Sequence, residues 1–212
     1  MNKQNIPAKI DLYSYPAQAE AYFTALTKAG ANVACIYGGV VRDADYNAYY
    51  GDLFEDFNEI PMKDYDIRVW LPETIFESKV NEVLDNLEKQ GAMISQAEQF
   101  NDHPRYIVDL FGDEIDLTLR PKPDSLVKRK SAIKNVACDR VVDAPVGLSA
   151  IALDMTMQAW ALPQYEDDRN GLKITILSHS KIENSLDYAE RLKKKYAFHD
   201  VIKPAGYKPK PV

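Results

Sequence analysis

Two stretches decide the fold: Ile36-Tyr37-Gly38-Gly39-Val40-Val41-Arg42-Asp43 and, further along the chain, Lys63-Asp64-Tyr65-Asp66-Ile67. The apolar run before Gly38 predicts a buried strand that breaks at the glycine pair and continues as a helix. Such a turn exposes free backbone N–H groups at the start of the helix, where they can bind phosphate. Two carboxylates at positions i and i+2 of a strand point to one face and can share a cation. Together the two stretches predict a phosphate site beside a metal site.

Each stretch alone is weak evidence, because a Gly-Gly pair is usually a turn and an Asp-x-Asp strand is usually a solvated face. Their order carries more information. Gly-Gly-x-x-Arg-Asp followed by Lys-Asp-x-Asp-Ile resembles the nucleotidyltransferases of the polymerase-β superfamily, and is most similar to the head domain of CCA-adding enzymes and bacterial poly(A) polymerases. The resemblance covers residues 17 to about 180. It implies an α+β fold, a mixed β-sheet flanked by helices, with a C-terminal helix.

Length and composition fit a globular protein. The 212 residues are enough for one domain that buries its own core. We expect residues 1–180 to form the nucleotidyltransferase head and residues 181–212 a C-terminal helix and a Pro/Lys-rich tail. No run is apolar enough to span a membrane, and residues 1–11 lack the hydrophobic segment of a signal peptide, so a cytoplasmic location is expected. The formal net charge of −6 argues against a protein that coats nucleic acid, although residues 122–134 and 193–210 could form local basic patches.

Cysteine and histidine provide no recognisable metal site. Cys35 and Cys138 lie in apolar surroundings and are expected to be buried thiols rather than a disulfide. The three histidines are scattered without zinc spacing. A metal in this protein would therefore be a hard cation held by oxygen, and the resemblance implies two Mg²⁺ ions, with Mn²⁺ as a substitute.

Periodicity predicts the elements around the two motifs. Apolar spacing with flanking Pro and Gly predicts helices at 16–29 and 72–91, and alternation predicts a strand at 64–70 after the strand at 32–37. Residues 44–62 are rich in aromatic and acidic side chains and are interpreted as a loop. Such a loop either stacks a base and caps the site or packs on its own rings at the surface.

A hairpin is predicted from strands 105–111 and 114–119, joined by a type II′ turn at Gly112-Asp113. In that register Asp109 lies opposite Asp116, and the apolar residues of both strands form one core-facing side. Opposed carboxylates repel unless a cation lies between them, so the pair predicts either a raised pKa or a bound metal. In the resembled family the third metal-binding carboxylate lies in an apolar-Asp-apolar context, and Ile115-Asp116-Leu117 matches it.

Residues 152–161, Ala-Leu-Asp-Met-Thr-Met-Gln-Ala-Trp-Ala, resemble the family motif Arg-Arg-Asp-Phe-Thr-Ile-Asn-Ala-apolar-Ala. The matching positions are Asp154, Thr156, Ala159 and Ala161. Ala152 and Leu153 stand where the motif has arginines, and Gln158 replaces Asn. The motif helps to hold the incoming nucleotide in the family, so these departures bear on nucleotide affinity or choice. The apolar positions also suit a helix or a buried strand.

The remaining charged segments are interpreted structurally. Glu166-Asp167-Asp168-Arg169 is similar to the Glu-Asp-x-x-Arg with which the family reads the base, but its arginine comes one residue early, and we interpret it as a charged loop. Residues 181–198 predict a final helix, whose Lys193-Lys194-Lys195 suits a helix C-terminus as well as it suits RNA. The tail from Lys203 is expected to be extended or disordered.

The resemblance implies nucleotidyl transfer, in which a hydroxyl attacks the α-phosphate of a nucleoside triphosphate and pyrophosphate leaves. It assigns catalysis and metal binding to Asp64, Asp66 and Asp116. It assigns nucleotide binding to the following residues: Gly38, Gly39, Arg42, Asp43, Lys63, Arg68 and Asp154. The expected acceptor is an RNA 3′ end, such as that of tRNA, with a protein hydroxyl or a small molecule as alternatives. A catalytically inactive nucleotide-binding or regulatory module of the same fold is the competing hypothesis.

Overall fold

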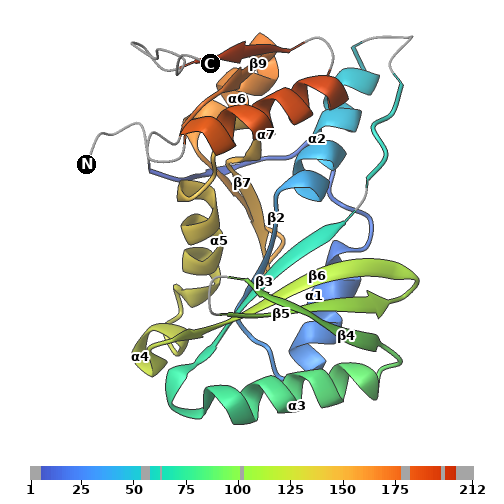
Figure 1. Cartoon of the computed structure of the whole chain (residues 1–212), viewed down its shortest axis with the longest axis vertical. Helices are drawn as coiled ribbons and strands as arrows, with labels where there is room; N and C mark the ends of the chain where they lie inside the picture. Colours follow the sequence, from blue (N-terminus) through green and yellow to red (C-terminus); the bar gives the residue numbers. More distant parts are fainter. Residues whose placement is uncertain are drawn as a thin grey trace.

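In a computed structural model the chain forms one large β-sheet with helices on both faces (Figure 1). The structure describes residues 6–53, 58–62, 64–100, 103–177, 182–196 and 199–203, without the side chains of 96–100 and 103. The helices are α1 (Ala19–Lys28), α2 (Gly39–Gly51), α3 (Phe76–Glu88), α4 (Asp124–Val127), α5 (Ala132–Val142), α6 (Pro163–Gly171) and α7 (Ile182–Lys195). The strands are β1 (Ala8–Ile10), β2 (Ala34–Tyr37), β3 (Tyr65–Pro72), β4 (Met93–Phe100), β5 (His103–Leu110), β6 (Asp113–Lys122), β7 (Ile151–Asp154), β8 (Ala159–Ala161), β9 (Lys173–Thr175) and β10 (Asp200–Ile202).

The large sheet has the strand order β1-β8-β7-β2-β3-β6-β5-β4. β3 and β6 run parallel, and the neighbouring pairs around them run antiparallel. β9 and β10 pair separately and in parallel. The prediction of a mixed sheet flanked by helices is therefore confirmed.

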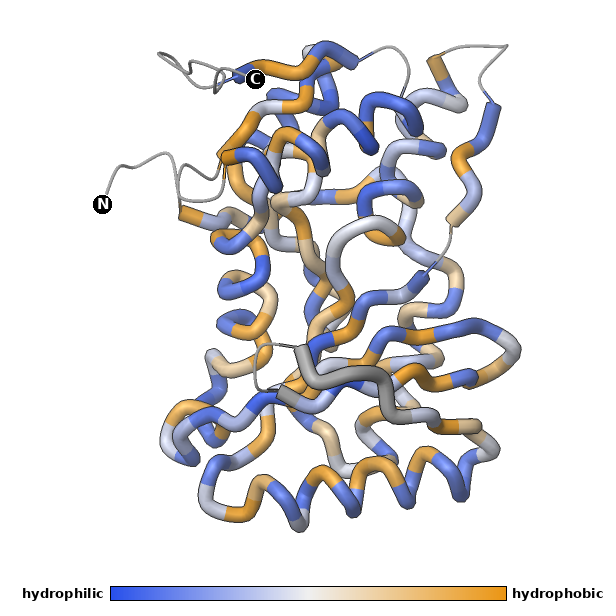
Figure 2. The backbone as a smooth tube through the Cα atoms, viewed as in Figure 1, coloured by the Kyte–Doolittle hydropathy of each residue, from blue (hydrophilic) through white to orange (hydrophobic). Residues whose placement is uncertain are grey.

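Alternation along the central strands divides the core between the two faces of the sheet. Ile36 of β2 and Ile67 of β3 lie in one cluster with the buried residues of α1 and α3, whereas Cys35 lies in a second cluster with α5. In Figure 2, α3 at the bottom of the view alternates between hydrophobic and hydrophilic residues, as expected of a helix with one buried side. Within the described residues, no helix has both the length and the hydrophobicity needed to cross a bilayer.

The prediction of a loop from residue 44 is wrong as far as Gly51, because α2 continues to that residue. Asp45 and Tyr46 within this part of α2 are buried. Asp45 accepts hydrogen bonds from Tyr165 and Arg169 of α6, at 2.6 Å each. Tertiary partners therefore favour helix where composition favoured a loop. Residues 54–57 of the predicted loop lie outside the described residues.

The hairpin exists, but its predicted turn and register are wrong. Leu110 pairs with Asp113, so the two turn residues are Phe111 and Gly112, which have φ angles of 60° and 87°. Positive φ at both central residues is the pattern of a type I′ turn rather than type II′. Consequently Asp109 lies opposite Glu114, and Asp116 lies opposite Ile107.

The prediction of a charged loop at 166–169 is also wrong, because these residues belong to α6. Pro163 lies in the first turn of α6, where backbone N–H groups make no hydrogen bond within the helix, so the lack of an N–H costs nothing there. Asp168 and Arg169 are buried, and the Asp168 carboxylate accepts hydrogen bonds from the backbone N–H and hydroxyl of Thr175, both at 2.7 Å. These contacts attach α6 to β9. The predicted final helix is confirmed as α7, while the tail from residue 204 lies outside the described residues.

Candidate active site

Asp66 and Asp116 are direct neighbours across two strands. The parallel pairing of β3 with β6 places Asp66 in register with Asp116. Ile67 and Leu117, the next residues on each strand, point into the core beneath α1 and α3, so both carboxylates lie on the opposite face of the sheet. Neighbouring strands lie about 4.8 Å apart, which is close enough for two carboxylates to share one cation.

The glycine turn lies against this carboxylate pair. Tyr37 pairs with Asp66, and Gly38 follows with φ 74° and ψ −130°, a conformation that glycine adopts and other residues avoid. A Cβ added to Gly38 would lie 3.2 Å from Oδ2 of Asp66. α2 begins at Gly39, so the free N–H groups of its first turn lie next to Asp66. The structure thus brings together four of the predicted site residues: Gly38, Gly39, Asp66 and Asp116.

The third predicted carboxylate does not join the pair. Asp64 precedes β3, is exposed and has φ 55°, so the alternation expected for residues 64–70 begins only at Tyr65. In the part of the chain that the structure describes, no three His, Cys, Asp or Glu side chains are grouped so that they could hold a metal ion. The structure therefore pairs two of the three predicted carboxylates, while Asp64 acts on Asp66 from the residue before β3. Lys63 lies outside the described residues.

The electrostatic environment of Asp66 is unfavourable for its charged form. Burial raises the pKa of Asp66 to about 6, and the adjacent Asp116 and nearby Asp64 add to the rise, while Arg140 and Arg105 oppose it. A carboxylate with a raised pKa in an accessible part of a fold is typical of functional sites.

Arg105 neutralises the other carboxylate. Its Nε lies 2.8 Å from both oxygens of Asp116, and its Nη2 forms an ion pair with the same group. The Arg105 side chain is 39 % exposed, so the pair lies at the surface and can be displaced. Sequence analysis missed Arg105, although the corrected register places it on the same face as Asp116, one diagonal step away.

Arg42 and Asp43 are not placed to reach a nucleotide in this structure. They are 2 % and 0 % exposed and form an ion pair with each other at 3.1 Å. Arg42 also donates to the hydroxyl of Tyr196 at 2.5 Å, and Asp43 accepts from Tyr196 and Lys195. These contacts join α2 to α7 and its C-terminal end, and the nucleotide-binding role of both residues stays a prediction.

Asp154 is also occupied by structural contacts. Its Oδ1 accepts hydrogen bonds from both the N–H and the hydroxyl of Thr156 and from the N–H of Gln158, while its Oδ2 accepts from the indole of Trp160 at 2.8 Å. The side chain is 2 % exposed. Asp154 therefore organises the turn between β7 and β8, and its contact with a nucleotide stays a prediction.

Arg68, the last predicted site residue, lies on the same face as Asp66 and belongs to a cluster of three arginines. Its guanidinium lies 5.5 Å from the ring of Tyr37, and that of Arg140 lies 4.1 Å from the same ring. Burial lowers the pKa of Arg68 to about 10, with further lowering by Arg140 and Arg120. Alternation along β6 could have indicated Arg120, which is four residues after Asp116, but nothing in the sequence pointed to Arg140 of α5.

The side chains present fit a Mg²⁺ ion held by two carboxylates. Mg²⁺ is usually bound through one or two carboxylates together with water and substrate phosphates, so Asp66 and Asp116 suffice as protein ligands. The bare Gly38 backbone comes close to Asp66, and burial beside Asp116 raises the pKa of Asp66, so an added positive charge would stabilise its ionised form.

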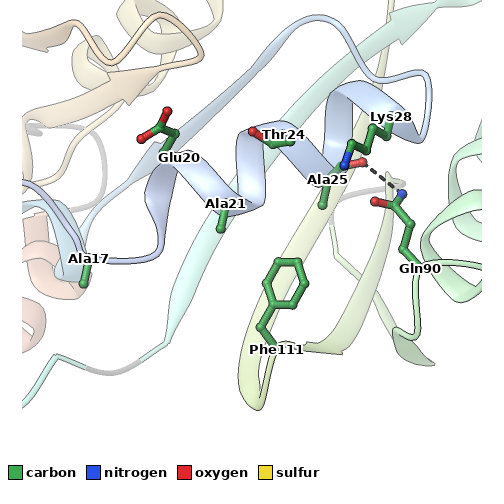
Figure 3. A pocket seen from close by; sticks show the side chains of 8 residues that line it. All are labelled: Ala17, Glu20, Ala21, Thr24, Ala25, Lys28, Gln90 and Phe111. Carbon is green, nitrogen blue, oxygen red and sulfur yellow. Dashed lines mark hydrogen bonds between the residues drawn. The ribbon is translucent and has the colours of Figure 1, made fainter.

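A surface hollow of about 450 Å³ lies elsewhere, along α1 (Figure 3). It is lined by small residues of α1, by Glu20 and Lys28, and by Phe111 of the hairpin turn, and Gln90 closes one end by donating to the carbonyl of Ala25 at 3.1 Å. α1 covers the face of the sheet opposite to Asp66, so this hollow is separate from the candidate site.

Comparison with known proteins supports the fold. No family model matches the sequence, and a comparison with curated protein sequences finds no match. Among solved structures, a CCA-adding enzyme in complex with CTP matches with a TM-score of 0.56 and 17 % identity, over 92 % of this chain and 44 % of that one. The complex with ATP gives a TM-score of 0.55 and 15 % identity, over 93 % and 43 %.

The CCA-adding enzyme of Thermotoga maritima, complexed with tRNA, gives a TM-score of 0.54 and 14 % identity, over 95 % of this chain and 43 % of that one. This chain spans less than half the length of each of these proteins. At this level of identity the likeness establishes the fold. The chain therefore has the nucleotidyltransferase fold found in CCA-adding enzymes, as its glycine and aspartate motifs predicted.

Proposed function

We propose that this chain is a nucleotidyltransferase that moves a nucleoside monophosphate from a nucleoside triphosphate to a hydroxyl group, with an RNA 3′ end as the acceptor. One observation carries the proposal: the Gly38 turn lies against Asp66, which is in register with Asp116. A single polyphosphate can therefore contact the first N–H groups of α2 and a cation held by the carboxylate pair at the same time.

The roles of the residues follow from this arrangement. Gly38 and Gly39 bind the triphosphate through their backbone, since the absence of side chains lets the phosphates approach closely. Asp66 and Asp116 hold Mg²⁺, which when bound neutralises phosphate charge and lowers the pKa of the attacking hydroxyl. In phosphoryl-transfer chemistry of this kind the protein contributes mainly positioning and electrostatics, so no further acid or base is required of the chain.

The nucleotide and the acceptor are proposed from the fold. The solved structures that share it are complexes with CTP, ATP and tRNA. We infer CTP or ATP as the donor for this chain and an RNA 3′ end as the acceptor.

A second candidate is a nucleotide-binding module without transfer activity. The ion pair between Arg105 and Asp116 favours it, because that arginine occupies both oxygens of a proposed metal ligand. The structural use of Arg42, Asp43 and Asp154 favours it as well, because these residues leave fewer side chains for a nucleotide.

The test is a transfer assay with each labelled nucleoside triphosphate and Mg²⁺, offering mixed RNA, a protein extract and small hydroxyl compounds as separate acceptors. The double variant Asp66→Asn/Asp116→Asn serves as the control for contaminating enzymes. Label that enters RNA with the wild type alone supports the proposal, and label that enters another pool alone identifies a different acceptor. A thermal shift that needs triphosphate and Mg²⁺, without transfer, favours the binding module. Absence of both results contradicts nucleotide binding altogether.

A further inference from the structure

Three arginines from three elements act on one another electrostatically, and two of them, Arg68 and Arg140, contact Tyr37 beside Asp66. Arg68 comes from β3, Arg120 from β6 and Arg140 from α5; we call them the arginine cluster. Arg68 is only 6 % exposed. In each of the three residues Nε is buried and has no hydrogen-bond partner among the described residues. A guanidinium presents five N–H donors and stays charged, so leaving such donors buried and unpaired is costly.

The cluster adjoins the candidate active site through Tyr37. Tyr37 is the last residue before Gly38 and pairs in register with Asp66. The guanidinium carbons of Arg68 and Arg140 lie 5.5 and 4.1 Å from the centre of its ring. Arg140 also acts electrostatically on Asp66. The positive charge of Arg68 and Arg140 therefore lies next to Asp66 and the glycine turn.

In the described part of the chain no ion pair involves the arginine cluster, although Arg140 acts on Asp66 at longer range. The ion pairs found there use other cations, such as Arg105 with Asp116 and Lys122 with Asp139. Three guanidinium groups that are close together and partly removed from water repel one another. An anion bound among them would relieve this repulsion and satisfy the buried donors, and the planar fork of arginine matches the oxygen spacing of phosphate.

We propose that the arginine cluster binds the pyrophosphate portion of the nucleoside triphosphate and of the released product. This inference rests on the proposed function for the identity of the substrate. The deep burial of Arg68 favours a compact, highly charged anion over the extended backbone of RNA. In this arrangement Asp66 and Asp116 hold the cation, and the arginine cluster neutralises phosphate charge that the cation does not reach.

The test measures binding of inorganic pyrophosphate to the metal-free protein by titration calorimetry in the presence of a chelator. We expect Arg68→Gln, Arg120→Gln and Arg140→Gln each to weaken binding by about tenfold, the loss expected for a hydrogen bond to a charged group. Arg129→Gln, which removes the same charge from an exposed position before α5, is expected to bind like the wild type. Equal loss in all four variants, or no loss in the three cluster variants, overturns the proposal.

A stability measurement separates binding from a structural role. Removal of a buried and unpaired charge is expected to leave the melting temperature of Arg68→Gln unchanged or higher, whereas a structural role would lower it. If Arg68→Gln does not fold, its buried charge is structural and the proposal fails for that residue; the half-buried Arg120 and Arg140 then decide for the cluster. Binding of a short 5′-phosphorylated oligoribonucleotide is measured with the same variants. If the cluster variants lose affinity for this RNA and keep their affinity for pyrophosphate, the choice of pyrophosphate as the ligand is overturned.

The outcome is independent of the transfer assay. Loss of pyrophosphate binding in the cluster variants of a protein that transfers no label supports the anion site and contradicts the proposed function. If the protein transfers label but its cluster variants bind pyrophosphate normally, the proposed function is supported and the anion site is contradicted.

Discussion

Arg105 reaches diagonally from β5 to Asp116 on β6, with its Nε 2.8 Å from both carboxylate oxygens. In this position the arginine competes with any cation that Asp116 is proposed to hold. We expect Arg105→Gln to lower the Mg²⁺ concentration for half-maximal transfer by about two- to fivefold, because a partly exposed ion pair contributes about 1 kcal/mol or less. A Mg²⁺ titration of initial rates measures this, with Arg129→Gln as the control. An unchanged midpoint would show that Asp116 is not a metal ligand.

Asp66 destabilises the metal-free fold when it is ionised. Its pKa of about 6 in the folded protein lies above the ordinary value of 3.8, so the folded state resists the loss of this proton. We expect Asp66→Asn to raise the free energy of unfolding by about 2 kcal/mol at pH 8 with chelator present, and to abolish transfer. The gain should shrink as pH falls through 6 and vanish below about 4, where both states are protonated. Denaturant unfolding at several pH values tests this, with the exposed Asp85→Asn as the control.

Gly38 combines a restricted backbone with a close neighbour. Gly38→Ala would place a methyl group 3.2 Å from Oδ2 of Asp66 at φ 74° and ψ −130°. We expect a loss of about 1–3 kcal/mol in the free energy of unfolding, together with weaker binding of triphosphate. Gly51→Ala is the matched control, since nothing lies within 4 Å of a Cβ at the end of α2. Equal stability of the two variants would contradict the conformation assigned to Gly38.

The hydroxyl of Tyr196 contacts both Arg42 and Asp43. Tyr196→Phe removes these hydrogen bonds and leaves two buried charges with fewer partners. We expect it to lower the free energy of unfolding by about 1.5–3 kcal/mol without changing the affinity for pyrophosphate. Tyr15→Phe, at a position that is 40 % exposed, is expected to have no effect. A large loss of nucleotide affinity in Tyr196→Phe at unchanged stability would instead return Arg42 and Asp43 to the binding site.

The buried side chain of His199 is expected to make the protein less stable in mild acid. Burial lowers its pKa to about 4, and its Nε2 contacts the hydroxyl of Tyr46. Because the unfolded state binds a proton near pH 6.5 and the folded state does not, stability should fall as pH decreases from 6.5 towards 4. Between pH 7 and 4.5 we expect the free energy of unfolding of His199→Gln to fall by about 2 kcal/mol less than that of the wild type. Parallel pH profiles for the two proteins would contradict this.

The sequence predicted the central part of the site and missed its surroundings. The glycine turn and the Asp66 strand are local patterns, and the apolar alternation of residues 105–119 made the hairpin recognisable even though its turn type was misread. Partners from distant elements could not be predicted. The ion pair of Asp45 with Arg169 keeps α2 helical, four donors occupy Asp154, and Arg140 reaches Tyr37 from a helix on another part of the chain. Each depends on tertiary packing, which a local pattern does not encode.

Asp66 and Asp116 belong to segments that are far apart in the chain and meet only through the parallel pairing of β3 with β6, after α3 and the β4–β5 hairpin have been crossed. Pairing of this kind closes a long loop and raises the contact order, which slows folding. The mutual repulsion of the two carboxylates is therefore absent in the early, locally organised chain and arises only at a late stage of assembly. Helices can form well before the site exists, and recovery of ligand binding should lag behind recovery of helical signal when the denatured protein is returned to native conditions.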